Sequence, residues 1–200
     1  MYQLDVLRHG ETELSHTLRG STNDALTLEG WQQMQSTINS VLSRQTMPWD
    51  VVFSSPLQRC EHFAQKLIEH HGLPLYRLKG LEEMHFGAWE GTTTAALYAQ
   101  FPEQLAQFWQ APSHFTPPDA EPMAGFAQRV HSALQQIQQC MQQHAYQRAL
   151  VVCHAGVIKL MKCWMLQQPI DDLLKMSAEL GQLNTFYLSE MATLHQTESR

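Results

Sequence analysis

The sequence of 200 residues is poor in cysteine and has no long apolar run. Its four cysteines lie far apart, form no C-x-x-C pair and have no histidine partner at zinc-ligand spacing, so we interpret them as reduced thiols. No run reaches the roughly 20 apolar residues that a membrane-spanning helix needs. The first ten residues show no basic region followed by an apolar stretch, so no signal peptide is expected. These absences predict a soluble, cytoplasmic protein.

Positive charge is scarce as well, with 13 Lys and Arg residues against 19 Asp and Glu residues and a net charge of −6. An acidic protein repels nucleic acids and anionic membranes unless its basic residues gather in one place. We therefore expect no nucleic-acid and no membrane partner. Oligomeric state stays open, with a homodimer as one alternative.

Hydrophobic patterning predicts strands that alternate with helices. Strands are expected at residues 4–7, 51–53, 75–78, 149–153 and 185–188. Helices are expected after an N-cap at Thr27, from Pro56 to about His71, across 126–141 and across 157–166. Between 80 and 122 prolines separate short helical pieces near 95–101 and 103–110, and the polar tail from Thr193 is expected to fray.

This order of elements predicts an α/β fold: a three-layer α/β/α sandwich with a mostly parallel sheet. We expect one domain over residues 1–200, with an irregular substrate-capping insertion at about 80–122. In such sheets the ligand binds beyond the carboxyl ends of the strands. Reactive side chains that follow three of the predicted strands should therefore converge there, namely Arg8, His9, Arg59 and His154.

Four sequence blocks resemble the histidine phosphatase superfamily, the group that includes the cofactor-dependent phosphoglycerate mutases. Residues 7–12 (LRHGET) resemble its first block and residues 54–59 (SSPLQR) its second. Residues 81–91 (LEEMHFGAWEG) and 151–158 (VVCHAGVI) resemble the third and fourth. The resemblance covers most of the chain and implies a phosphoglycerate mutase-like fold and a histidine acid-type phosphatase.

The chemistry of phosphate transfer explains these blocks. A phosphomonoester is a dianion, and a neutral imidazole can attack it without bringing further negative charge. We therefore select His9 as the nucleophile that forms a phosphohistidine. Arg8 and Arg59 can hold phosphate oxygens and stabilise the charge of the transferring group. Arginine and histidine supply the positive charge, so we expect neither a metal nor another cofactor.

The resemblance implies two further catalytic residues. His154 would hydrogen-bond an equatorial phosphate oxygen. Glu83 would give the leaving oxygen its proton and later take one from water; Glu82 is the alternative donor. Thr12 and Ala155, which lie within the first and fourth blocks, are further candidates for substrate contact.

The substrate is predicted from a second, closer resemblance. Residues 18–27 (LRGSTNDALT), the compact length and residues 115–122 (FTPPDAEP) resemble the α-ribazole-5′-phosphate phosphatases of cobalamin synthesis. Here Arg19 stands where the superfamily usually has Gln, which suggests an extra cation for phosphate. An aromatic base needs an apolar slot, which could be formed by Phe86, Trp89, Trp109 and Phe115. Glu121 is expected to cap or line the pocket.

We therefore expect a small-molecule phosphomonoester as the substrate, either α-ribazole 5′-phosphate or adenosylcobalamin 5′-phosphate. The alternatives are a broad-specificity phosphatase, a phosphoglycerate mutase, or a non-catalytic phosphate-binding protein on the same fold. A metallohydrolase is disfavoured because the sequence has no H-x-H, H-E-x-x-H or Asp-rich ligand spacing.

Overall fold

The computed structural model describes residues 1–196 and contains a six-stranded sheet in the order β3-β2-β4-β1-β5-β6. Four strands are parallel, and they are β1 (Tyr2–Arg8), β2 (Val51–Ser54), β3 (Leu75–Arg77) and β4 (Arg148–Cys153). The fifth strand, β5 (Leu183–Leu188), runs antiparallel to β1, and β6 (Leu194–His195) runs antiparallel to β5. Every predicted strand is therefore present.

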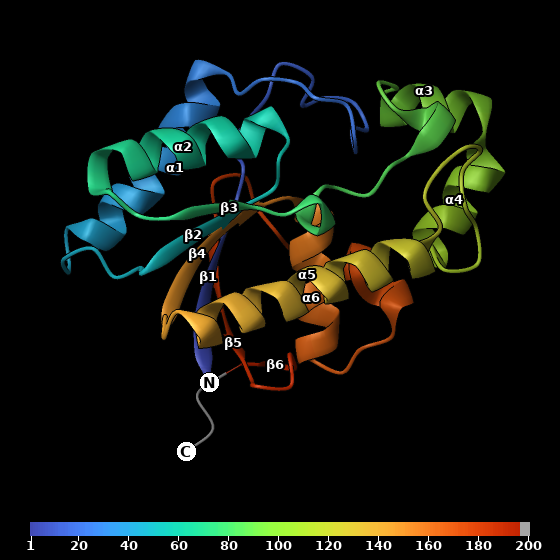
Figure 1. The fold of residues 1–200 in the computed structure, drawn as a ribbon. Helices are drawn as coiled ribbons and strands as arrows, with labels where there is room; N and C mark the ends of the chain where they lie inside the picture. Colours follow the sequence, from blue (N-terminus) through green and yellow to red (C-terminus); the bar gives the residue numbers. More distant parts are fainter. Residues whose placement is uncertain (197–200) are drawn as a thin grey trace.

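Helices cover both faces of the sheet (Figure 1). One face carries α1 (Leu28–Leu42) and α2 (Gln58–His71), and the other carries α5 (Met123–Gln143) and α6 (Ala155–Met165). Strand β4 shows why both layers form. Leu150 and Val152 pack with α1 and α2, whereas Val151 and Cys153 pack with α5 and α6, and all four side chains are buried. The predicted three-layer α/β/α sandwich is confirmed.

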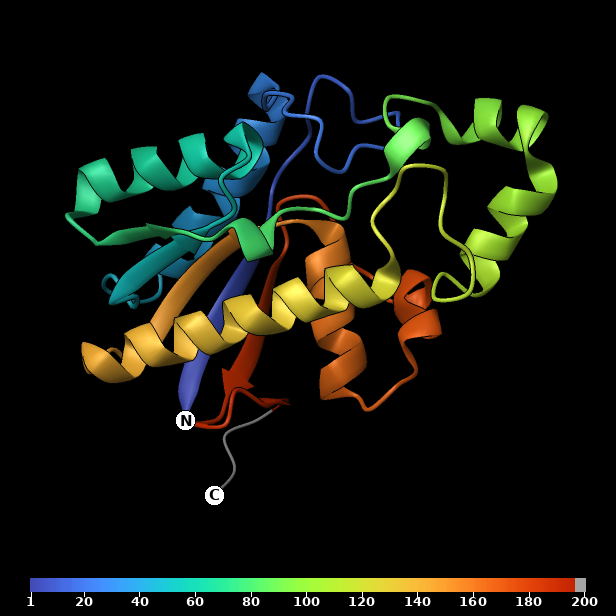
Figure 2. The ribbon, with the colours of Figure 1, turned by 45° about the vertical axis from the view of Figure 1, so that its right-hand side comes forward.

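The segment between β3 and α5 forms a small helical layer beside the carboxyl ends of the strands (Figure 2). It contains α3 (Thr94–Gln100), α4 (Pro102–Gln110) and the short helices η1 (Lys79–Leu81) and η2 (Gly87–Trp89). A further short helix, η3 (Ile170–Lys175), follows α6. The predicted helical pieces correspond to α3 and α4, and η3 was not predicted.

Several element boundaries differ from the prediction by one to three residues. Thr27 caps α1 as expected, since its Oγ1 accepts the Gly30 N–H at 3.0 Å. Helix α2 begins at Gln58 with Leu57 as its N-cap, so Pro56 lies before the helix and not in its first turn. Helix α6 begins directly after His154, two residues earlier than predicted. The tail was expected to fray from Thr193, but residues 194–195 pair with β5; residues 197–200 lie outside the described residues.

No helix within residues 1–196 combines the length and the apolar character that a membrane crossing requires.

Candidate active site

A cavity of about 360 Å³ lies at the carboxyl ends of β1 and β4, and Thr94 of α3 and Phe108 of α4 also line it. Its charged and titratable lining comes from four separate segments and consists of Arg8, His9, His16, Arg19, Glu83 and Lys159. Its apolar lining consists of Leu18, Met84, Phe86, Phe108, Met123, Phe126, Ala155, Leu173, Leu174 and Leu180. The cavity therefore joins a cationic end, beside a histidine, to an apolar wall.

His9 is held in one tautomer at the end of β1. Its Nδ1 lies 2.7 Å from the Gly10 carbonyl oxygen, so the N–H donates there and Nε2 keeps a free lone pair. The side chain is only 3% exposed. Burial, together with Arg59, Arg8 and Arg19, lowers the pKa of His9 well below its ordinary value. The site thus presents a neutral imidazole with Nε2 available for attack.

His154 and Arg59 lie next to His9 but behind the cavity wall. The rings of His9 and His154 are 5.2 Å apart, and His154 is fully buried. Arg59 Nε donates to His154 Nδ1 at 3.2 Å, and His154 Nε2 lies 2.8 Å from Ser55 Oγ. Burial, followed by Arg59, lowers the pKa of His154 well below its ordinary value. Both ring nitrogens are engaged by protein groups, so the expected bond to an equatorial phosphate oxygen is not preformed.

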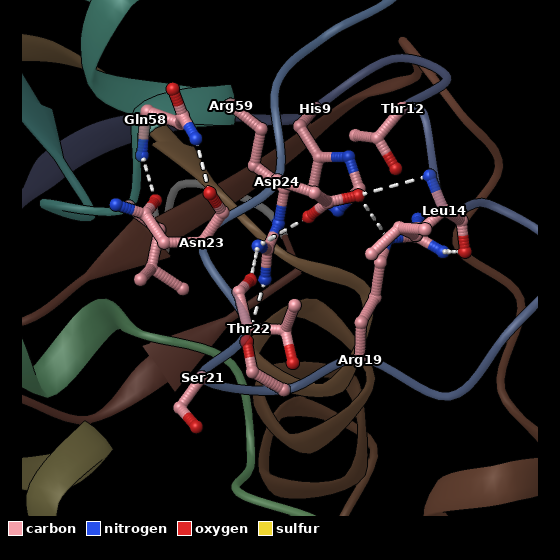
Figure 3. A network of polar contacts seen from close by, with 12 residues as sticks. His9, Thr12, Leu14, Arg19, Ser21, Thr22, Asn23, Asp24, Gln58 and Arg59 are labelled. Carbon is pink, nitrogen blue, oxygen red and sulfur yellow. Dashed lines mark hydrogen bonds and ion pairs between the residues drawn. The ribbon is translucent and has the colours of Figure 1, made fainter. Parts of the chain in front are cut away.

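Arg59 is enclosed by the loop that precedes α1 (Figure 3). Besides His154, its guanidinium group donates to the carbonyl oxygens of Gly20 (2.7 Å) and Thr22 (2.6 Å) and to Asp24 Oδ1 (3.0 Å). These bonds use four of the five N–H groups of an arginine. Arg59 therefore anchors this loop beneath the cavity in addition to any contact with phosphate.

Asp24 is a buried carboxylate between two arginines, as Figure 3 shows. Its Oδ1 pairs with Arg59, and its Oδ2 lies 3.2 Å from Arg19 Nε and accepts the Leu14 N–H at 3.4 Å. The expectation that Arg19 offers an extra cation is thus met only in part, because Arg19 lines the cavity but is partly neutralised by Asp24.

Two buried donors in this cavity lack a hydrogen-bond partner. Within residues 1–196 three buried side-chain polar atoms are unsatisfied, and two of them are Arg8 Nε and Arg19 Nε. The second is close to Asp24 but lacks the alignment of a hydrogen bond. Arg8 is also held by a residue outside the cavity lining, since its Nη1 donates to the Ala178 carbonyl oxygen at 2.5 Å. Buried donors are rarely left unpaired, so these two N–H groups beside His9 indicate an anion site.

Glu83 lines the same cavity, whereas Glu82 does not. The Glu83 carboxylate accepts the Met84 N–H with Oε1 and the Gly156 N–H with Oε2, both at 2.9 Å. A Cβ atom at position 156 would lie 2.2 Å from Glu83 Oε1, so a larger residue there would force the Glu83 carboxyl group to move. The geometry therefore favours Glu83 over Glu82 as the carboxyl group that faces a bound substrate.

Several predicted substrate contacts lie outside the cavity lining. Trp89 is 2% exposed and packs against Phe108 and Phe115, so it belongs to the core of the α3–α4 layer. Trp109 is 47% exposed to solvent, and of the four proposed slot aromatics Phe86 alone is in the lining.

Two predicted polar contacts, Thr12 and Glu121, also lie outside the cavity lining. Thr12 is buried, with its hydroxyl group 3.3 Å from Ser15 Oγ, and Ser15 lines the cavity in its place. Glu121 forms an ion pair with Arg129 and does not line the cavity. Ala155 is in the lining, as expected.

Other residues of the site were not singled out from the sequence. Lys159 lines the cavity from the second turn of α6, and burial and then Arg8 lower its pKa. Asp24 lies within residues 18–27 and Ser55 within residues 54–59. The family resemblance of these two segments was the signal that could have identified both residues. Lys159 has the spacing of an ordinary helix-surface lysine, so the sequence gave no signal that it belongs to the site. Within residues 1–196 no group of three or more His, Cys, Asp or Glu side chains is arranged to hold a metal ion.

Comparison with known proteins shows the family of the chain. The family model of the histidine phosphatase superfamily (branch 1) matches residues 4–194. The adenosylcobalamin/alpha-ribazole phosphatase of Escherichia coli K12 is 28% identical over 201 residues, which cover 99% of this chain and 96% of that protein.

Two solved structures are similar over nearly the whole chain. The alpha-ribazole phosphatase from Shigella flexneri has a TM-score of 0.78 at 27% identity, covering 98% of this chain and 96% of that one. Bacillus stearothermophilus YhfR has a TM-score of 0.84 at 24% identity, covering 98% and 95%, and supports the fold alone. Since the family model spans almost all of the sequence, the chain belongs to the histidine phosphatase superfamily.

Proposed function

We propose that this chain is a metal-independent phosphomonoesterase that acts through a phosphohistidine on His9 and that its substrate is α-ribazole 5′-phosphate. The observation that carries the proposal is the pair of unsatisfied buried donors, Arg8 Nε and Arg19 Nε, in the cavity lined by the neutral His9. An anionic phosphate group satisfies both donors and lies against a nucleophile that adds no negative charge.

In the first step His9 Nε2 attacks phosphorus, the N–P bond forms and the ester P–O bond breaks. The hydrogen bond from Nδ1 to Gly10 holds the ring and stabilises the positive charge that the imidazole gains. The leaving oxygen takes a proton from the Glu83 carboxyl group and departs as the alcohol. In the second step water attacks phosphorus, the N–P bond breaks, and Glu83 takes the proton of the water.

The apolar wall supports a substrate that carries an aromatic base. Phe86, Phe108 and Phe126 line the cavity, and the first two rings meet edge to face at 6.2 Å. The cavity volume of about 360 Å³ lies within the range of small-ligand sites. A benzimidazole ribonucleotide fits this combination of cationic end and apolar wall. The corrin ring of adenosylcobalamin 5′-phosphate is too large for it and would lie outside.

A comparison of substrates tests the proposal. Without added metal and with EDTA, kcat/KM is measured for α-ribazole 5′-phosphate, 3-phosphoglycerate, phosphoserine, fructose 2,6-bisphosphate and p-nitrophenyl phosphate. A value for α-ribazole 5′-phosphate at least on the order of 100-fold above the others supports the substrate. A flat profile that still depends on His9 would retain the mechanism and reject the substrate.

One observation favours a second candidate, a phosphatase for substrates with a further anionic group. Lys159 lines the cavity and is a third cation there beside Arg8 and Arg19. If it binds a second carboxylate or phosphate, Lys159→Met raises KM for phosphoserine and 3-phosphoglycerate. The same variant leaves KM for α-ribazole 5′-phosphate unchanged if the first candidate is right.

A further inference from the structure

Arg129, on α5, divides its guanidinium group between Glu121 and the segment that carries Glu83. Its Nε and Nη2 donate to the two carboxylate oxygens of Glu121 at 2.7 and 2.8 Å. Its Nη1 donates to the carbonyl oxygens of Gly80 (3.1 Å) and Glu82 (2.7 Å), and Nη2 also donates to that of Glu83 (2.8 Å). These five bonds account for all five N–H groups of an arginine.

Glu121 holds the same segment two residues further along, at His85. Its N–H donates to the His85 carbonyl oxygen at 3.0 Å, and its Oε2 lies 3.4 Å from the His85 nitrogen, which donates to it. Residues 80–85 are thus fixed at four carbonyl oxygens and one N–H by a single ion pair. A lysine could not replace the arginine, because an ammonium group lacks the planar fork that reaches several acceptors at once.

The segment needs this support because residues 82–86 belong to no helix or strand. On one side η1 packs against α5 (Figure 2), and on the other the Glu83 side chain meets the Gly156 N–H of α6. Arg129 is itself fixed, since its guanidinium lies 4.8 Å from the centre of the Phe126 ring. The backbone of Glu83 is therefore placed by α5 and its carboxyl group by α6.

We propose that the Glu121–Arg129 pair is a positioning device for the proton donor. It holds the backbone of Glu83 so that the carboxyl group stays within reach of the leaving oxygen. Neither Glu121 nor Arg129 lines the cavity, so they act through Glu83 and not on the substrate. The inference rests on the proposed function, in which Glu83 protonates the leaving group.

The choice of leaving group separates this role from a merely structural one. An alkyl phosphate needs a proton donor, whereas p-nitrophenolate leaves readily without one. Arg129→Lys is therefore expected to lower kcat for an alkyl phosphate on the order of 10- to 100-fold, because a small misplacement of a reacting group costs that much. Its kcat for p-nitrophenyl phosphate is expected to change less than about threefold.

Arg148→Lys is the matched control. Arg148 pairs with Asp5 at 2.7 Å, and the side chains of Arg148 and Arg129 are both 25% exposed. Arg148 begins β4, at the end of the sheet opposite to the active site. This variant is expected to affect both substrates equally. Circular dichroism checks folding, and Glu121→Gln provides the same test if Arg129→Lys is too unstable.

The Glu83→Gln background completes the experiment. With the proton donor removed, Arg129→Lys should cause no further loss on the alkyl phosphate. An equal loss on both substrates, or losses that multiply in the double variant, would overturn the positioning role alone, provided that Glu83→Gln itself discriminates between the two substrates. If Glu83→Gln affects both substrates equally, the proton-donor assignment fails and the positioning role fails with it.

Discussion

His9 and His154 are buried side by side, and at the residue scale this burial determines their charge. The pKa of each is lowered well below its ordinary value, first by burial and then by the Arg59 guanidinium. Both rings are therefore neutral in the folded protein under conditions in which an exposed histidine begins to gain a proton. Neutrality is what a nucleophilic His9 requires, because a protonated ring has no lone pair at Nε2.

This burial has a consequence for stability. The unfolded chain binds protons at the ordinary histidine pKa of about 6.5, whereas the folded chain does not, so stability is present above that pH and is lost as the pH falls. Each histidine contributes at most about 1.4 kcal/mol per pH unit to this loss. Urea unfolding between pH 7 and pH 5 should show a smaller decrease for His154→Asn than for the wild type. Equal slopes would contradict a neutral, buried His154.

Gly156 offers a second test at this scale. In Gly156→Ala the added Cβ would lie 2.2 Å from Glu83 Oε1, so the carboxyl group has to move. We expect kcat for an alkyl phosphate to fall on the order of 100-fold. Gly125→Ala, near the start of α5, is the control, because its Cβ would meet nothing closer than Glu121 Cγ at 3.8 Å. Similar kinetics for the two variants would show that Glu83 does not depend on this close approach.

At the scale of elements, Glu90 connects the third sequence block to the loop around Arg59. Its carboxylate accepts the N–H groups of Gly20 (3.0 Å), Ser21 (2.9 Å) and Thr22 (2.8 Å), and that of Phe86 (3.1 Å). Burial raises the pKa of Glu90, but the hydrogen bonds, led by that from the Thr22 side chain, outweigh it, so the pKa is lowered overall. The loop held in this way supplies two of the carbonyl oxygens that fix Arg59.

Glu90→Gln should therefore loosen the arginine end of the cavity. The amide replaces one acceptor oxygen with a donor that faces backbone N–H groups, at a cost of about 1–3 kcal/mol. We expect weaker inhibition by inorganic phosphate, with Ki raised roughly 5- to 100-fold. Glu103→Gln, at an exposed position in α4, is the control. An unchanged Ki for Glu90→Gln would mean that the loop keeps its position without this carboxylate.

The sheet explains which parts of the whole molecule could be predicted from the sequence. His9 and His154 follow two predicted strands, so the strand pattern places both at the carboxyl edge of the sheet. That β1 and β4 are adjacent, which brings the two rings together, is shown by the structure. The apolar slot could not be predicted in this way. Trp89 and Phe108 lie in a proline-rich segment without a long hydrophobic period, which gives no sign that the first is core and the second is cavity wall.

Long-range polar contacts also could not be predicted from the sequence. Glu90 contacts residues about 70 positions earlier, and Arg129 contacts residues more than 40 positions earlier. A charged residue on an amphipathic helix is typical of a solvated face, so the spacing of Arg129 and Lys159 gives no indication of these contacts. Only the packing of α5 against η1, and of α6 against the cavity, places them at the site.

The proposed mechanism requires a covalent phosphohistidine on His9, and this intermediate can be trapped. The enzyme is mixed with ³²P-labelled substrate, quenched within milliseconds in alkali and digested, and the labelled peptide is identified by mass spectrometry. We expect a label that is stable to alkali and labile to acid on the peptide containing His9, and no label in folded His9→Ala. A label on another residue, or turnover by His9→Ala at a rate near that of the wild type, would contradict the proposed mechanism.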